Sequence, residues 1–70
     1  MPKAQPVTRR LLRLKAAAEY VSLSAWKLRD VVQRGDIPLV QYGENAPWLL
    51  DVGDLDRWIE QHKVNLNAKV

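Results

Sequence analysis

Residues 15–38, KAAAEYVSLSAWKLRDVVQRGDIP, decide the fold, because they hold two short helical patterns separated by a break of three residues. Residues 15–21 are rich in alanine, which favours a helix. Ala17, Tyr20 and Val21 have the spacing of one apolar helix face. Lys15 opposes the positive end of this helix's dipole, so we expect the first helix to be held mainly by packing.

A second helix is predicted over residues 24–34. Ser24 is a suitable N-cap, and Gly35 stands where a left-handed residue commonly ends a helix. Pro38 prevents the helix from resuming. Two short helices joined by a three-residue turn make a helix-turn-helix arrangement.

The second helix has one apolar face and one polar face. With a turn of about 100° per residue, the apolar residues fall within about 60° of Leu28. The face predicted to be buried consists of Ala25, Leu28, Val31 and Val32. The outward face consists of Trp26, Lys27, Arg29, Asp30, Gln33 and Arg34. Side chains of these types can bond phosphates and base edges and can contact a thymine methyl group. These six residues, together with Ser24 at the start of the helix, are therefore candidate DNA contacts.

Trp26 admits two interpretations. An exposed tryptophan is costly unless it meets a partner, so it can mark a contact surface. Alternatively, Trp26 folds back onto the domain or onto the N-terminal arm. The sequence leaves both open.

Towards the C-terminus, two β-prone runs, 39–42 and 48–51, flank Gly43-Glu44-Asn45-Ala46-Pro47 and predict a hairpin. A third helix is predicted over residues 51–61. The residues of its apolar side are Leu55, Trp58, Ile59 and His62. Tyr20, Trp48 and Trp58 are all expected in the core.

Towards the N-terminus, residues 1–9 are predicted to form a flexible basic arm, and residues 10–14 either a short strand or a lead-in segment. The domain itself is expected over residues 10–63, followed by a tail at 64–70. Arg9, Arg10 and Arg13 are candidate DNA contacts, because basic N-terminal arms can follow a minor groove.

Charge is distributed unevenly along the 70 residues. Residues 1–34 carry eight Lys and Arg against two Asp and Glu, whereas residues 35–70 carry three against six. A basic half joined to an acidic half suggests that a polyanion is met on one side, although ordinary surface charge explains the imbalance equally well.

Catalysis and metal binding have little support in the sequence. The chain has no cysteine and one histidine, so a metal site is not expected. Ser22 and Ser24 have no nearby base that could activate a hydroxyl. We expect no enzyme activity and no cofactor. No apolar run is long enough for a membrane span, no secretory signal is present, and the absence of cysteine fits a reducing cytoplasm.

The ordered set of motifs resembles the excisionase-family, MerR-like winged helix-turn-helix domain. The resemblance covers about residues 10–62. It rests on Ala17-Ala18-Glu19-Tyr20, Leu23-Ser24, Arg34-Gly35-Asp36-Ile37-Pro38, Trp48-Leu49-Leu50 and Asp54-Leu55-Asp56-Arg57-Trp58-Ile59. It implies a mainly α fold with a small β-hairpin, that is, three helices plus a wing. It also implies that the second helix enters the major groove, which puts Lys27, Arg29, Gln33 and Arg34 on DNA.

The wing departs from the family pattern. Family wings carry arginines near the turn, whereas this one offers Glu44, Asn45, Ala46 and Pro47. A wing without cations gains little from phosphates. The arm with Arg9, Arg10 and Arg13 is therefore a candidate replacement for it.

Three functions remain open. The first is an excisionase, or recombination directionality factor, which would bind and bend attachment-site DNA and direct a site-specific integrase. The chain's length, with no attached effector domain, favours this role. Several protomers are expected to line up on the DNA, because one small domain makes few contacts. The second is a small transcriptional regulator of a mobile element on the same fold. The third, from a different class, is a protein-interaction module anchored by Trp26.

Overall fold

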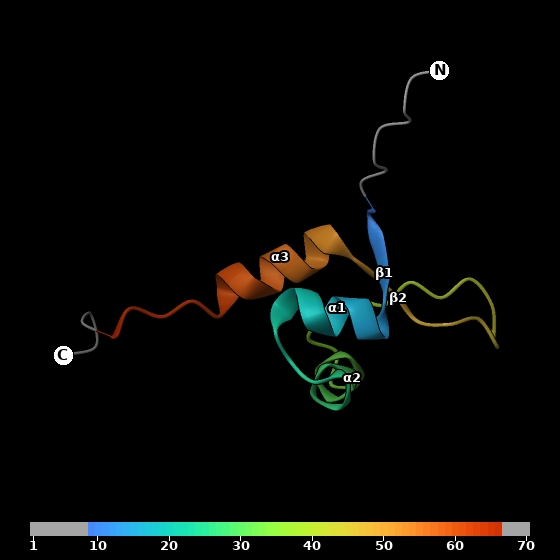
Figure 1. Ribbon diagram of the computed structural model, residues 1–70, viewed down its shortest axis with the longest axis horizontal. Coiled ribbons are helices and arrows are strands. Elements are labelled where there is room, and N and C mark those ends of the chain that lie inside the picture. Colours follow the sequence, from blue (N-terminus) through green and yellow to red (C-terminus); the bar gives the residue numbers. More distant parts are fainter. Residues whose placement is uncertain (1–8, 67–70) are drawn as a thin grey trace, which may run out of the picture.

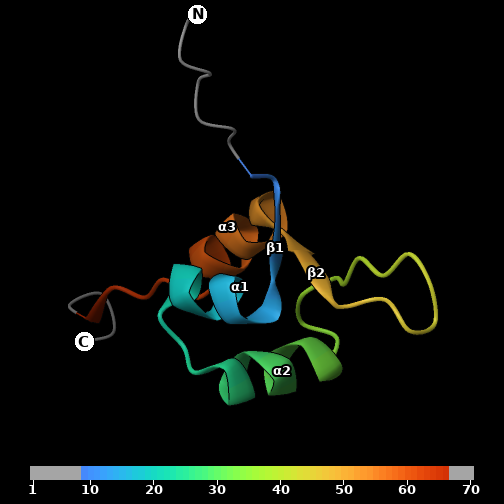
Figure 2. The same cartoon turned by 45° about the vertical axis from the view of Figure 1, so that its right-hand side comes forward.

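The computed structural model of the chain describes residues 9–66. Along these residues β1 (Leu11–Arg13) is followed by α1 (Leu14–Val21), α2 (Ala25–Gln33), β2 (Leu49–Asp51) and α3 (Val52–Gln61). This part of the chain is mainly helical, with three helices and one small antiparallel sheet, as predicted. In both ribbon views α1 lies between α2 and α3 (Figures 1 and 2). The predicted arm at residues 1–8 and the end of the predicted tail, 67–70, lie outside the described residues.

The predicted turn between the first two helices is confirmed, with one feature that the sequence did not reveal. Ser24 caps α2, since its Oγ accepts a hydrogen bond from the Lys27 N–H at 3.0 Å. Gly35 has a φ of +86°, the left-handed conformation expected after the helix. Ser22 ends α1 with a φ of +62° although it has a side chain. The Leu23 N–H donates to the Ala18 carbonyl at 2.9 Å across this turn, so an orphan carbonyl of α1 is satisfied.

The core is built from the inner faces of all three helices, from β2 and from Ile37 in the segment after α2. Its fully buried large side chains are Leu28, Ile37, Leu50 and Leu55. The predicted inner face of α2 is confirmed at Leu28, Val31 and Val32 but is wrong at Ala25, which is exposed at the first residue of the helix. A helical wheel predicts the direction in which a side chain points. It does not predict whether another part of the protein covers that end of the helix, and Ala25 is left uncovered.

The sheet pairs segments that are far apart in the sequence. β1 runs antiparallel to β2, with Leu12 opposite Leu50, so the strand alternative for residues 10–14 is confirmed. The predicted hairpin forms only at its base, where Val40 and Leu49 exchange hydrogen bonds of 2.8 and 3.0 Å. The predicted strand at 39–42 is otherwise wrong, because β2 bonds to β1 rather than to a full partner strand at this position. The loop of residues 41–47 extends away from the helices (Figure 2).

The three aromatic side chains expected in the core are not enclosed there. Tyr20 is 45% exposed, and its hydroxyl donates to Asp56 Oδ1 at 2.6 Å. Trp48 and Trp58 are half-buried and pack against the edge of the core. The small residues Ala17 and Ala18 occupy the inner face of α1 instead, so the helices approach closely and large rings are displaced to the rim.

The apolar side predicted for the third helix is confirmed in part. Leu55 is fully buried and Ile59 is half-buried, but His62 is exposed. The His62 ring lies 4.5 Å from the Trp58 ring, measured between centroids. Asp51 caps the helix, with its Oδ1 accepting from the Gly53 N–H at 2.8 Å.

Candidate nucleic-acid interface

The predicted outward face of α2 is open to solvent. Trp26 is 75% exposed, so it does not fold back onto the part of the domain that the structure describes. Lys27, Arg29 and Gln33 are also exposed, whereas Asp30 is half-buried. The aromatic ring is therefore held on the surface of a helix whose opposite side is in the core.

A shallow hollow of about 290 Å³ lies on this face. It is lined by Trp26, Arg29, Asp30 and Gln33. These residues have spacings of three, four and seven along the chain, so their side chains form one stripe on the helix. The stripe offers a π-face, a guanidinium group, a carboxylate and an amide, which together can donate to and accept from base edges.

Arg34, a further predicted contact, is exposed but has carboxylate partners within the protein. Its Nε lies 3.5 Å from Asp30 Oδ2, and its Nη2 lies 3.9 Å from Asp36 Oδ2. Both pairs are solvent-exposed and so hold the side chain only weakly. Arg34 therefore adds less net positive charge to this face than Arg29 does.

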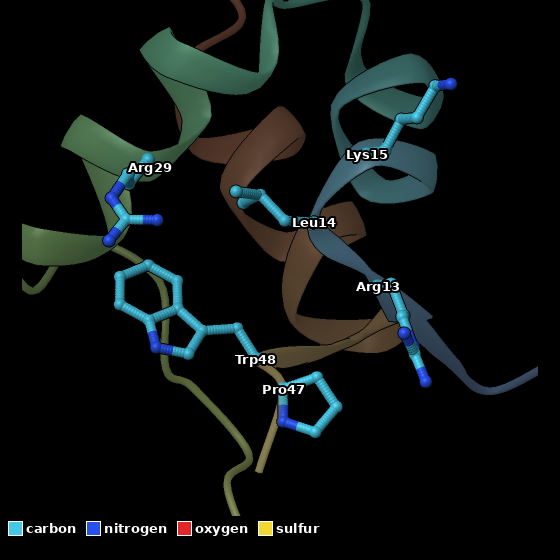
Figure 3. A pocket seen from close by; sticks show the side chains of 6 residues that line it. All are labelled: Arg13, Leu14, Lys15, Arg29, Pro47 and Trp48. Atoms are coloured by element: carbon cyan, nitrogen blue, oxygen red, sulfur yellow. The ribbon is translucent and has the colours of Figure 1, made fainter. Parts of the chain in front are cut away.

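Arg29 is held by an aromatic ring rather than by a carboxylate. Its guanidinium carbon lies 4.9 Å from the centroid of the Trp48 ring, and the two side chains face one another in Figure 3. A cation–π contact positions the guanidinium group without neutralising its charge. Trp48 was not predicted as a site residue, because a tryptophan beside a predicted strand is ordinarily a core residue.

A second hollow, of about 420 Å³, lies beside this stack. It is lined by Arg13, Leu14, Lys15, Arg29, Pro47 and Trp48 (Figure 3). A third hollow, lined by Arg9, Arg13, Lys15, Ala16 and Glu19, shares two residues with it. These shared residues join Arg9, Arg13, Lys15 and Arg29 into one surface, which we call the basic band.

No residue of the basic band has a carboxylate within ion-pair distance, as far as residues 9–66 show. Lys15 is the member of the band that was not predicted to lie at the interface. A signal for it was present, because a lysine in the first turn of a helix opposes the helix dipole. A side chain in a position that does not favour folding is a candidate for a role in binding.

The three arginines predicted for the arm differ in their surroundings. Arg9 and Arg13 belong to the basic band, whereas Arg10 Nε donates to Asp51 Oδ2 at 3.0 Å. The pKa of Asp51 is lowered, first by the hydrogen bond from the Gly53 backbone N–H and then by Arg10. The Arg10 side chain remains 83% exposed, so it can still reach an anion. Unlike Arg9 and Arg13, however, it would have to share its charge with Asp51.

The loop of residues 41–47 carries no cation and one carboxylate, Glu44. Its backbone is closed by the Ala46 N–H, which donates to the Gly43 carbonyl at 3.2 Å, and by Gln41 Nε2, which donates to the Ala46 carbonyl at 3.0 Å. Tyr42 is 77% exposed. The loop tip thus offers no cation to attract a phosphate.

Within residues 9–66, no group of three or more histidine or carboxylate side chains could hold a metal ion. None of the helices in that range combines the length and apolar content that crossing a membrane requires.

Comparisons of the chain with protein-family models, with curated proteins and with solved structures find no match. The resemblance to the excisionase family therefore stays a prediction from the sequence motifs.

Proposed function

We propose that this domain binds double-stranded DNA with α2 in the major groove. One observation carries the proposal: the cations of the basic band lie beside the open face of α2, and none of them has a carboxylate partner among the described residues. Cations gathered without internal counter-charges fit a polyanionic partner.

On this proposal the stripe on α2 reads the bases. Arg29 suits the O6 and N7 acceptors of guanine, and Gln33 suits the N6 and N7 groups of adenine. Trp26 provides an apolar surface for a thymine methyl group. Arg9, Arg10 and Arg13 approach the adjacent backbone or minor groove, since the loop tip lacks cations. The proposal includes no catalytic step, metal or cofactor.

Salt dependence tests this proposal directly. Binding of a mixed-sequence duplex of about 20 base pairs is measured by fluorescence anisotropy as salt is raised from about 50 to about 200 mM. If the four cations of the basic band each neutralise one phosphate, affinity falls about a hundredfold over this range. A salt-independent affinity, or no binding at the lower salt, contradicts the proposal.

For the biological role, we propose an excisionase, a cytoplasmic recombination directionality factor that bends attachment-site DNA and directs an integrase. The resemblance of residues 10–62 to that family supports this role, and the lack of cysteine fits the compartment. The test is an excision assay with an integrase and its attachment sites. Stimulated excision supports the role, and its absence together with repression of a nearby promoter favours the transcriptional regulator.

A protein-interaction module is the alternative from another class. The 75% exposure of Trp26 favours it, because tryptophan is a common anchor of protein interfaces. Such an interface should be much less sensitive to salt than DNA binding. A Trp26-dependent, salt-insensitive complex with a protein, without affinity for any duplex, would establish this alternative.

A further inference from the structure

The hollow beside the Arg29–Trp48 stack has two kinds of wall. Its apolar surface comes from Leu14 at the start of α1 and from Pro47 and Trp48 just before β2. Arg13, Lys15 and Arg29 line the hollow as well; the Arg29 guanidinium faces the Trp48 ring, whereas the charged ends of Arg13 and Lys15 extend outward from the rim (Figure 3). No carboxylate lines it, so the hollow suits a ligand with one apolar face and one anionic group.

The charge of these cations is available to such a ligand. Within the described part of the chain, Arg13 and Lys15 make no ion pair and no side-chain hydrogen bond, and the Arg29 guanidinium makes a cation–π contact with Trp48 but no ion pair. Arg13 is on β1, Lys15 is on α1 and Arg29 is on α2. Three separate elements therefore place uncompensated cations at the rim of one hollow.

Arg29 also lines the hollow on α2, so it lies at the boundary between the two. A ligand beside the Arg29–Trp48 stack is thus adjacent to whatever the α2 stripe contacts. In duplex DNA, the units adjacent to the base edges are the sugar and phosphate of the strand that borders the groove. A deoxyribose ring has an apolar face, and the phosphate attached to it carries the negative charge.

We propose that this hollow binds one sugar–phosphate unit of the duplex whose major groove receives α2. Arg13 and Lys15 hold the phosphate, and Pro47 and Trp48 contact the deoxyribose. The segment before β2 therefore contacts the backbone through its apolar base, while its cation-free tip stays clear. This assignment rests on the proposed function.

Lys15→Ala is the main test, because Lys15 is exposed and has no internal partner whose loss would disturb the fold. Its matched control is Lys63→Ala, which removes an exposed lysine that pairs with Glu60 at 2.9 Å. The probe is the mixed-sequence duplex of about 20 base pairs. Lys15→Ala should reduce the slope of log affinity against log salt by about one and weaken binding roughly tenfold at about 50 mM salt. Lys63→Ala should leave both quantities unchanged.

Arg29→Ala separates failure of this inference from failure of the proposed function. If Arg29→Ala weakens duplex binding but Lys15→Ala and Arg13→Ala behave like Lys63→Ala, the hollow holds no phosphate and this inference alone is overturned. If none of the variants changes duplex binding, the proposed function fails with it.

A second probe identifies the group on the apolar wall. The single strand of the same sequence is compared with the duplex for the wild type and for Trp48→Leu, with thermal unfolding confirming that the variant is folded. The assignment expects the duplex to bind more tightly and Trp48→Leu to weaken it. Tighter binding of the single strand, lost in Trp48→Leu, would mean that a base stacks on Trp48 and would overturn the sugar assignment.

Discussion

The charged side chains around α3 differ from those on the β1–α1–α2 side in whether they have interaction partners within the protein. From Asp51 to Lys63 every charged side chain has an internal partner: Asp51 with Arg10, Asp54 with Arg57, Asp56 with the Tyr20 hydroxyl, and Glu60 with Lys63. On the other side, Arg9, Arg13, Lys15, Lys27 and Arg29 have no carboxylate partner among residues 9–66.

This difference shows why net charge alone says little about the partner of such a small domain. The net charge of +3 conceals one region whose charges are matched internally and another in which five cations have no ion-paired carboxylate. Exposed ion pairs contribute little to stability, and neighbouring like charges oppose folding. On the proposed function, an external anion compensates these cations.

The largest expected effect separates the two faces of α2. Leu28→Ala removes a fully buried side chain and should lower the free energy of unfolding by about 2–5 kcal/mol, which is much of the stability of so small a domain. Trp26→Ala, on the exposed face, should change it by less than about 0.5 kcal/mol. Urea unfolding followed by circular dichroism measures both. Equal losses would mean that Trp26 is part of the core.

The next effect compares one arginine from each region. Arg29→Ala should cost about 1–3 kcal/mol of binding to a duplex selected from a random pool and should relax specificity at one base pair. Arg57→Ala, on α3, removes the partner of Asp54 and should leave DNA affinity unchanged. Anisotropy titrations of both variants give the comparison. If Arg57→Ala lost as much DNA affinity as Arg29→Ala, the two regions would not differ in DNA binding.

Acid should weaken the α3 side through Asp51. The pKa of this carboxyl group is lowered in the fold by the Gly53 N–H and by Arg10, so its charged form is favoured by folding. The contribution of this carboxylate to the free energy of unfolding is complete above the ordinary aspartate pKa, and it is lost as the pH falls through the lowered pKa. Asp51→Asn should therefore show a smaller loss of melting temperature in acid than the wild type. An identical acid profile would contradict the lowered pKa of Asp51 in the fold.

The smallest expected effect lies at alkaline pH. The hydrogen bond to Asp56 raises the pKa of the Tyr20 hydroxyl, so folding favours its neutral form. This contribution is complete below the ordinary tyrosine pKa and is lost as the pH rises through the raised value. Tyr20→Phe should remove that alkaline component, measured as melting temperature against pH. A wild-type profile in the variant would show that the link between α1 and α3 is not formed.

Local signals predicted much of the fold and most of the exposed face of α2. The N-cap Ser24, the left-handed Gly35 and the inner face at Leu28 follow from interactions within a few residues. The pairing of β1 with β2 could not be read from the sequence, because it joins residues about 40 positions apart. The same limit explains why Trp48, assigned to the core, lies beside Arg29 on the surface.

The central claim is that the uncompensated cations, and not the paired charges of α3, meet duplex DNA. An NMR titration of the isotope-labelled chain with the mixed-sequence duplex tests it most directly. The account predicts that amide signals of α2 and of residues 9–15, together with the Trp48 indole signal, shift progressively while those of residues 54–63 stay in place. Shifts confined to α3, or no shifts along α2, would contradict it.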